Sequence, residues 1–149
     1  MFKQHIGKRS TKVKNAVERG AVKKFAEAIG DIQPIYFDEE VGKQSRYKAN
    51  IAPPTFPRTF DYGEIEGFHL PVKGLIHGEQ TFHYARPLLV GEDIFCYSVV
   101  KSYMEKKGGF GNMGFLVLES FGEEAAGNTI FSSTMTIVIS EAVRKVLTQ

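Results

Sequence analysis

The apolar residues change their spacing near Gly74, and this change limits the possible folds more than any other feature of the chain. After Gly74, four segments are rich in Val, Ile, Thr, Tyr and Phe, which favour strands. These segments cover residues 75–85, 92–105, 110–121 and 128–139. The last two connections between them are short and contain glycine, as the turns of β-hairpins do. The second half is therefore predicted to form an antiparallel meander, which an early strand near residues 11–17 joins.

The first half has helical spacing instead. Apolar side chains recur at i, i+3, i+4 and i+7 within residues 18–29, and charged side chains take the other face. Gly30 follows at a position where helices commonly end, and Asp38 is suited to cap a second helix at residues 39–45. A third helix is expected at residues 55–62, after a pair of prolines.

These elements indicate one fold class. No linker rich in Ser, Gly or Pro is long enough to separate two domains. Helices followed by a run of strands are typical of an α+β fold. We expect a single domain over residues 1–149, in which helices cover one face of an antiparallel sheet of about five strands.

The composition excludes several classes of protein. With 42% hydrophobic residues, the 149-residue chain can build one core. Its long apolar runs, such as residues 115–118, are far shorter than the roughly 20 residues of a membrane helix. The basic N-terminus lacks the apolar segment of a secretory signal, so we expect a cytoplasmic protein without a membrane partner. A net charge of +2 does not indicate a nucleic-acid partner.

No metal site or cofactor is expected. Cys96 is the only cysteine, which excludes a disulfide framework and a multi-cysteine metal centre. His77 and His83 lie six residues apart on a predicted strand, or about 20 Å, which is too far to share an ion. His77 and Glu79 are expected on one face of that strand, and solvent or interface positions are favoured for both over a polar groove.

The loop at residues 30–38 has the composition of a site. Asp31 lies just beyond a predicted helix end, in a loop that Pro34 stiffens and apolar residues flank. A carboxylate that is partly desolvated and fixed in direction is suited to act as a general base or to position water. The alternative is that Asp31 only bonds loop amides while Tyr36 packs against the sheet, and spacing alone favours this alternative.

Four segments resemble the MaoC-like (R)-hydratase/dehydratase superfamily, and more narrowly its N-terminal-half dehydratase branch. They are Phe-Ala-Glu-Ala-Ile-Gly-Asp at 25–31, Pro-Ile-Tyr-Phe-Asp at 34–38, Ile-Ala-Pro-Pro-Thr-Phe at 51–56 and Arg-Pro-Leu-Leu-Val-Gly-Glu-Asp at 86–93. The resemblance implies a hot-dog fold, in which an antiparallel sheet wraps a central helix. It also implies that pairs of such modules bury acyl-thioester tunnels between them.

The resemblance also implies site residues. In catalytic members the loop reads Gly-Asp-x-Asn-Pro-[Ile/Leu]-His-x-Asp, and its Asp and His act on the water that is added to or removed from a 2-enoyl thioester. Asp31 takes the Asp position, Tyr36 the His position and Gln33 the Asn position. Asp31 and Tyr36 are therefore the candidate catalytic residues, although a phenol is a much weaker base than an imidazole at neutral pH.

A second departure concerns the thioester carbonyl. Catalytic members place a Gly at the start of the central helix, and its amide hydrogen binds that carbonyl. The matching residue here is Pro54, which has no amide hydrogen, so Thr55 is the nearest candidate donor. The candidate substrate-binding residues are Gln33, Pro34, Ala52, Pro54, Thr55 and Phe56.

The resemblance implies a (3R)-hydroxyacyl-thioester dehydratase component that acts on thioesters of CoA or acyl carrier protein. It implies a homodimer, or a heterodimer with a catalytic MaoC-like subunit that supplies the Asp and His. Two alternatives are open. One is a hot-dog acyl-CoA thioesterase that uses Asp61 or Glu64 near the end of the third helix. The other is an acyl-thioester-binding subunit without activity.

Overall fold

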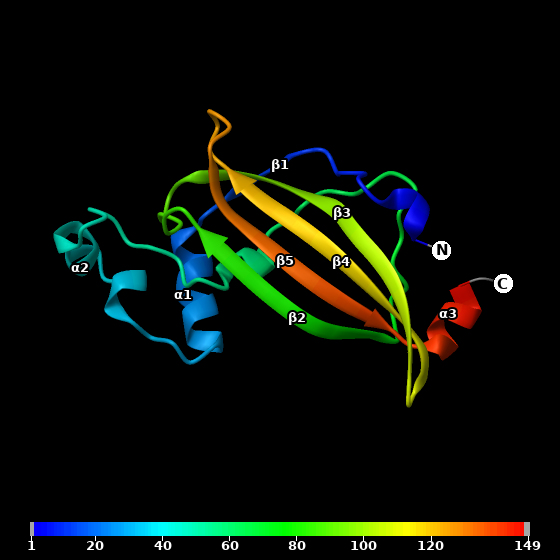
Figure 1. Ribbon diagram of the computed structural model, residues 1–149. Helices are drawn as coiled ribbons and strands as arrows, with labels where there is room; N and C mark the ends of the chain where they lie inside the picture. Colours follow the sequence, from blue (N-terminus) through cyan, green and yellow to red (C-terminus); the bar gives the residue numbers. More distant parts are fainter. Residues whose placement is uncertain (1, 148–149) are drawn as a thin grey trace.

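The computed structural model describes residues 2–147 and contains one antiparallel sheet of five strands (Figure 1). In space the strands follow the order β1-β3-β4-β5-β2, so β1 and β2 form the two edges. Their bounds are β1 Val13–Ala16, β2 Leu75–Tyr84, β3 Asp93–Gly108, β4 Gly111–Glu123 and β5 Thr129–Ile139. The predicted α+β class and the number of strands are confirmed. The predicted meander holds only for β3, β4 and β5, because β2 pairs with β5 at the far edge and not with β3, the next strand in sequence.

Short helices cover one side and the two ends of the sheet. They are η1 Lys3–His5, α1 Arg19–Ala28, η2 Pro34–Tyr36, α2 Glu39–Gln44, η3 Phe56–Thr59 and α3 Glu141–Leu147, where η marks a 3-10 helix. Asp38 caps α2 as predicted, because its Oδ1 accepts hydrogen bonds from the amides of Glu40 and Val41 at 3.0 and 3.3 Å. The sequence did not predict α3. Within residues 2–147, no helix is long and apolar enough to cross a membrane.

The third predicted helix is much shorter than expected. The segment at residues 55–62 contains only the four residues of η3, and the backbone at Phe60 is already extended. The backbone of residues 61 and 62 bonds other segments instead of continuing the helix. The Asn15 side chain bonds both the amide and the carbonyl of Asp61, and the Ser10 hydroxyl donates to the carbonyl of Tyr62. The ten-residue α1 therefore provides the longest helix against the sheet, and η3 adds Phe56 beside it.

The covered face of the sheet carries two separate apolar clusters. The α1-side cluster includes Val22 and Ala26 of α1, Phe56 of η3, and Cys96 and Phe131 of the sheet. The α3-side cluster lies toward the end of the sheet where α3 is drawn in Figure 1, and Val143 of α3 packs against it. Its buried residues are Phe2, Ile65, Val100, Tyr103, Leu116, Ile137 and Ile139.

A row of three serines lies between the two clusters. Ser98 of β3 pairs with Ser120 of β4, and Ser120 pairs with Ser133 of β5. Partners in neighbouring strands point to the same face, so the three hydroxyls form a polar line across the sheet, which we call the serine row. The hydroxyls of Ser98 and Ser120 are hydrogen bonded at 2.7 Å. The core of the protein is thus divided by polar side chains.

Strand β2 contains a β-bulge that changes which side chains share a face. His77 pairs with Ile137 and Glu79 pairs with Thr136, so Gly78 is the extra residue between them. Because Ile137 and Thr136 are neighbours and point to opposite faces, His77 and Glu79 also lie on opposite faces. The prediction that these two side chains share a face is wrong, since the bulge reverses the alternation of the strand.

Candidate functional site

A cavity of about 400 Å³ lies beside the end of β2, and we call it the tyrosine pocket. It is formed by η2, the loop after α2, the segment before η3 and the residues that follow β2. Residues important for its chemistry are Tyr36, Arg46, Ala52, Pro54, Tyr84 and Arg86. The cavity therefore brings together side chains from four separate parts of the sequence.

Tyr36 is buried and donates a hydrogen bond from its hydroxyl to Oδ2 of Asp31, at 3.1 Å. Burial raises the pKa of Tyr36, and the hydrogen bond to Asp31 and its negative charge raise it further. The phenol therefore stays protonated at neutral pH. Tyr36 can donate a proton or a hydrogen bond, but it cannot act as the base that an imidazole provides.

The end of α1 positions Asp31. Gly30 has a φ of +72°, and the Asp31 amide donates to the carbonyl of Ala26 at 3.0 Å, which turns the chain out of the helix. Pro34 then starts η2, and the Tyr36 amide bonds the Gln33 carbonyl at 3.0 Å. This short, hydrogen-bonded loop brings the Asp31 carboxylate within hydrogen-bonding distance of the Tyr36 phenol, which lies five residues later in the sequence.

The predicted substrate-binding residues are found in different surroundings. Ala52 and Pro54 line the tyrosine pocket. Thr55 is exposed, and Phe56 is buried in the α1-side cluster. Gln33 and Pro34 are exposed on η2 and its approach, outside the lining of the cavity.

Sequence reasoning missed Tyr84 and the two arginines of the pocket. Burial raises the pKa of Tyr84 well above its usual range, and its hydroxyl donates to the Pro54 carbonyl at 2.6 Å. Arg86 binds both carboxylate oxygens of Glu92 at 2.8 Å and Glu124 at 3.1 Å, so its charge is compensated. The sequence signal for the ion pair between Arg86 and Glu92 was their opposite charges in one short connection, six positions apart.

Arg46 is exposed and lies over the ring of Tyr47, 5.4 Å from its centroid. No carboxylate among residues 2–147 lies within ion-pair distance of Arg46. The tyrosine pocket therefore has one uncompensated positive charge at its edge, which attracts anions.

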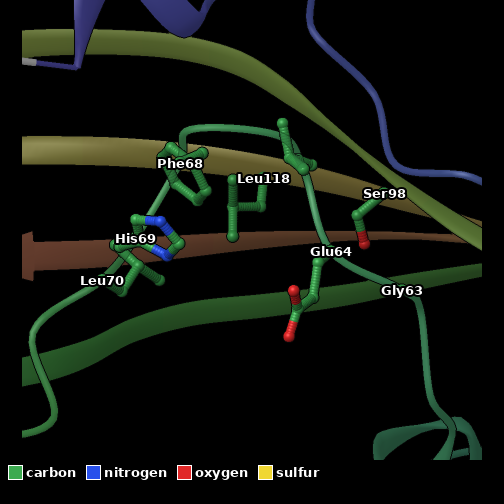
Figure 2. Close-up of a pocket in the computed structure, with 8 residues that line it drawn as sticks. Gly63, Glu64, Phe68, His69, Leu70, Ser98 and Leu118 are labelled. Carbon is green, nitrogen blue, oxygen red and sulfur yellow. The ribbon is translucent and has the colours of Figure 1, made fainter.

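A second cavity, of about 300 Å³, lies between the loop at residues 63–70 and the sheet. Figure 2 shows Ser98 and Leu118 on the strands, and Glu64 and His69 on the loop. The His69 ring and the Glu64 carboxylate do not point toward one another in this view, so they do not form an acid–base pair.

Asp61 is exposed, and its Oδ1 accepts a hydrogen bond from the Gly63 amide at 2.8 Å, which closes a turn. Both Asp61 and Glu64 lie beyond the end of η3, so neither carboxylate is on or at the end of a long central helix as the thioesterase alternative expects. Among the described residues, no three His, Cys, Asp or Glu side chains come close enough to hold a metal ion.

Comparison with known proteins gives a family and a fold. The sequence pattern of the family described as "FAS1-like, dehydratase domain region" matches residues 4–133. A UPF0336 protein of Thermobifida fusca is 31% identical over 132 residues, which cover 83% of this chain and 82% of that protein.

Two solved complexes from Mycobacterium tuberculosis have a similar fold. One is a C-terminally truncated HadBC complex, a (3R)-hydroxyacyl-ACP dehydratase, with a TM-score of 0.73, 20% identity, and coverage of 93% of this chain and 99% of that one. The other is the ChsH1–ChsH2 complex, with a TM-score of 0.72, 18% identity and coverage of 90% of each chain.

Proposed function

Because this chain belongs to the FAS1-like dehydratase-domain family, within the MaoC-like hot-dog superfamily, we propose that it is one component of a (3R)-hydroxyacyl-thioester dehydratase. The reaction is the reversible removal of water from a 3-hydroxyacyl thioester of CoA or acyl carrier protein. The hydrogen bond between Asp31 and Tyr36, whose ring lines the tyrosine pocket together with Pro54, carries the proposal.

The pair of Asp31 and Tyr36 supports a chain that supplies only part of the active site. Removal of water needs a base for the proton next to the thioester carbonyl and an acid for the departing hydroxyl. Tyr36, with its raised pKa, is a donor only. No histidine lines the tyrosine pocket in the part of the chain that the structure describes. A partner subunit with the intact Asp and His loop therefore supplies the imidazole.

The thioester carbonyl also needs a hydrogen-bond donor. Pro54 has none, and the Phe56 amide already bonds the Pro53 carbonyl at 2.9 Å. The Thr55 amide is the nearest candidate that is left on this segment. One donor in place of two gives weaker stabilisation of the developing oxyanion, which agrees with a chain that binds substrate while its partner performs the chemistry.

The sheet edge favours a second subunit. Strand β2 pairs only with β5, so its other side presents ten residues of backbone without a neighbouring strand among residues 2–147. Such an edge readily accepts another strand. The related HadBC and ChsH1–ChsH2 structures are themselves complexes of two different chains, which supports a heterodimer with a catalytic MaoC-like subunit.

The test compares the chain alone with the chain in complex. Purified chain, candidate MaoC-like partners and their complexes are given crotonyl-CoA and longer 2-enoyl-CoAs, and hydration is followed by the loss of enoyl-thioester absorbance. We expect hydration by a complex and little by the chain alone. In that complex Asp31→Asn in this chain retains most of the rate, whereas the matching change in the partner removes it. Hydration in no combination overturns the proposal.

A double substitution tests whether the pocket already positions a thioester. Tyr36→His with Pro54→Gly restores both the imidazole and the amide donor. We expect this variant to hydrate crotonyl-CoA without a partner, because the rest of the pocket is unchanged. Pro54→Gly alone is the control, since it lacks the base and is expected to stay inactive.

A further inference from the structure

Asn50 is a buried polar residue that the proposed chemistry does not use. It is 3% exposed and lies directly before Ile51 and Ala52, which line the tyrosine pocket. The Val90 amide donates to the Asn50 carbonyl at 2.9 Å. The Ala52 amide donates to the Leu88 carbonyl, also at 2.9 Å. The backbone of Asn50 is therefore fixed to the connection that follows β2, at one wall of the pocket.

The Asn50 side chain forms hydrogen bonds with three other elements. Its Nδ2 donates to the carbonyl of Ile35 in η2 at 2.8 Å, and to the carbonyl of Asp38 at the start of α2 at 2.7 Å. Its Oδ1 accepts from Nη1 of Arg19, the first residue of α1, at 2.7 Å. A side-chain amide has two donor hydrogens, and both are used here. Asn50 thus joins η2, α1 and α2 to the pocket wall.

The bond to Ile35 holds the short helix that presents Tyr36. Inside this turn the Tyr36 amide bonds the Gln33 carbonyl, which does not fasten η2 to the rest of the protein. The Ile35 carbonyl, directly before Tyr36, accepts from the Asn50 side chain at 2.8 Å and from the Ile51 amide at 3.3 Å. The side-chain bond is the shorter of the two, so Asn50 sets the distance between η2 and the pocket wall.

The partners of Asn50 keep other hydrogen bonds when its side-chain amide is removed. The Ile35 carbonyl keeps the Ile51 amide, and the Asp38 carbonyl keeps the bond that it accepts within α2 at 2.9 Å. Arg19 is exposed, so water replaces Asn50 as its partner. The Asn50 side chain therefore determines where η2 lies more than whether η2 forms.

We propose that Asn50 is a positioning residue of the active site. It fixes η2, and with it the Tyr36 hydroxyl, relative to Asp31 and to the pocket wall at Ala52. The inference rests on the proposed function, because that function places the thioester in the tyrosine pocket. Since the partner subunit performs the chemistry, a displaced Tyr36 weakens substrate binding and leaves the rate of the bound substrate nearly unchanged.

Fluorine NMR tests the position of Tyr36 without any substrate. The full chain is labelled with 3-fluorotyrosine, and the Tyr36 resonance is assigned by its loss in Tyr36→Phe. Asn50→Asp keeps the size of the side chain and an acceptor for Arg19, but an ionised carboxylate has no donor. We expect this variant to shift and broaden the Tyr36 resonance, and to leave that of Tyr103 in the α3-side cluster unchanged. A Tyr36 resonance identical to that of the unaltered chain overturns the inference.

Ser10→Ala is the matched control. Ser10 is also buried, and its hydroxyl donates to the Tyr62 carbonyl at 2.6 Å and accepts from the Ser98 amide at 2.9 Å, outside the lining of the tyrosine pocket. Both variants lose hydrogen bonds of a buried side chain, so both should unfold at a lower temperature. Only Asn50→Asp should move the Tyr36 resonance. Equal changes of that resonance in the two variants would indicate general loosening and overturn the inference.

Kinetics of the active complex test the consequence for the substrate. We expect Asn50→Asp to raise the KM for crotonyl-CoA about fivefold while kcat stays within about twofold, because binding is lost equally in the ground state and the transition state. Ser10→Ala should change neither. An unchanged KM overturns the inference. If the Tyr36 resonance moves but no complex hydrates any substrate, the proposed function fails, and the role of Asn50 in placing Tyr36 stands.

Discussion

The two apolar clusters on the sheet are closed in different ways. The α1-side cluster is closed by shape, since the ring of Phe131 lies directly against Gly122 of the next strand. The α3-side cluster is closed partly by charge: Arg144 pairs with Glu105 at 2.5 Å, and Glu141 accepts a hydrogen bond from the Asn112 amide at 3.1 Å. We therefore expect volume changes to damage the first cluster and acid to loosen the second.

The largest effect is expected from Gly122→Ala. A Cβ at Gly122 would lie 2.1 Å from Cε1 of Phe131, so the ring or the strand must move. The free energy of unfolding should fall by about 3 kcal/mol, as overpacking of a core does. Urea unfolding followed by circular dichroism measures it. Gly108→Ala is the matched control, because a Cβ there meets no atom within 4 Å. A similar loss in both variants would show that the α1-side cluster is not closed by shape.

Arg86→Met tests whether charge also matters at the α1-side end. Arg86 ties Glu92 and Glu124 to a loop that carries the buried Leu88, and its loss leaves the half-buried Glu92 without its cation. We expect about 1–2 kcal/mol of lost stability, measured by the same urea unfolding, because the pair is partly shielded from water. Lys43→Met, which breaks an exposed pair with Glu40, should cost much less. A larger loss from Lys43→Met than from Arg86→Met would contradict the expectation that partial shielding from water strengthens the Arg86 pair, whereas no loss from Arg86→Met would mean that shape alone closes the α1-side end.

Acid should act first on the α3-side end. The Asn112 amide, and then the side chain and charge of Lys145, lower the pKa of Glu141 below its ordinary value of 4.5. Its contribution to stability is complete above pH 4.5 and is lost as the pH falls through the lower folded value. Hydrogen exchange between pH 6 and 3 should therefore show α3 and the start of β4 opening earlier than α1. Glu141→Gln should remove much of this pH dependence. Glu27→Gln, at an exposed position of α1, is the control and should not change it.

The smallest effect is expected from Gly20→Ala. Gly20 is exposed in α1, and a Cβ there meets no atom within 4 Å. Alanine restricts the unfolded chain and favours the helix, so the free energy of unfolding should rise by about 0.5 kcal/mol. Thermal unfolding measures this change. A decrease in the free energy of unfolding would mean that the exposed face of α1 makes packing contacts at Gly20, and the structure shows no atom within 4 Å of a Cβ there.

Sequence patterns predicted the helices and strands that depend on interactions between residues close together in the chain. The strands follow β-favouring residues, and α2 begins at Asp38 because that side chain bonds the first amides of the helix. The helix expected at residues 55–62 ends early because of distant contacts, since the backbone of residues 61 and 62 bonds the side chains of Asn15 and Ser10.

The parts of the site that could not be predicted depend on contacts between distant segments. Tyr84 reaches the pocket only because β2 brings it to the Pro54 carbonyl, thirty residues away in sequence. The serine row likewise depends on strand register, since Ser98, Ser120 and Ser133 have no common spacing. In contrast, Asp31 and Tyr36 lie in one loop, so their proximity could be anticipated from sequence.

The bulge at Gly78 has a consequence for the choice of a partner. Backbone groups of a strand alternate between its two sides, and an extra residue shifts the phase of that alternation. The free side of β2 therefore offers two hydrogen-bonding patterns, one along residues 75–77 and another along residues 79–84. A regular strand matches one of them, whereas a strand with its own bulge matches both. Any strand that pairs with this edge must therefore match the backbone pattern of β2, whatever its side chains are.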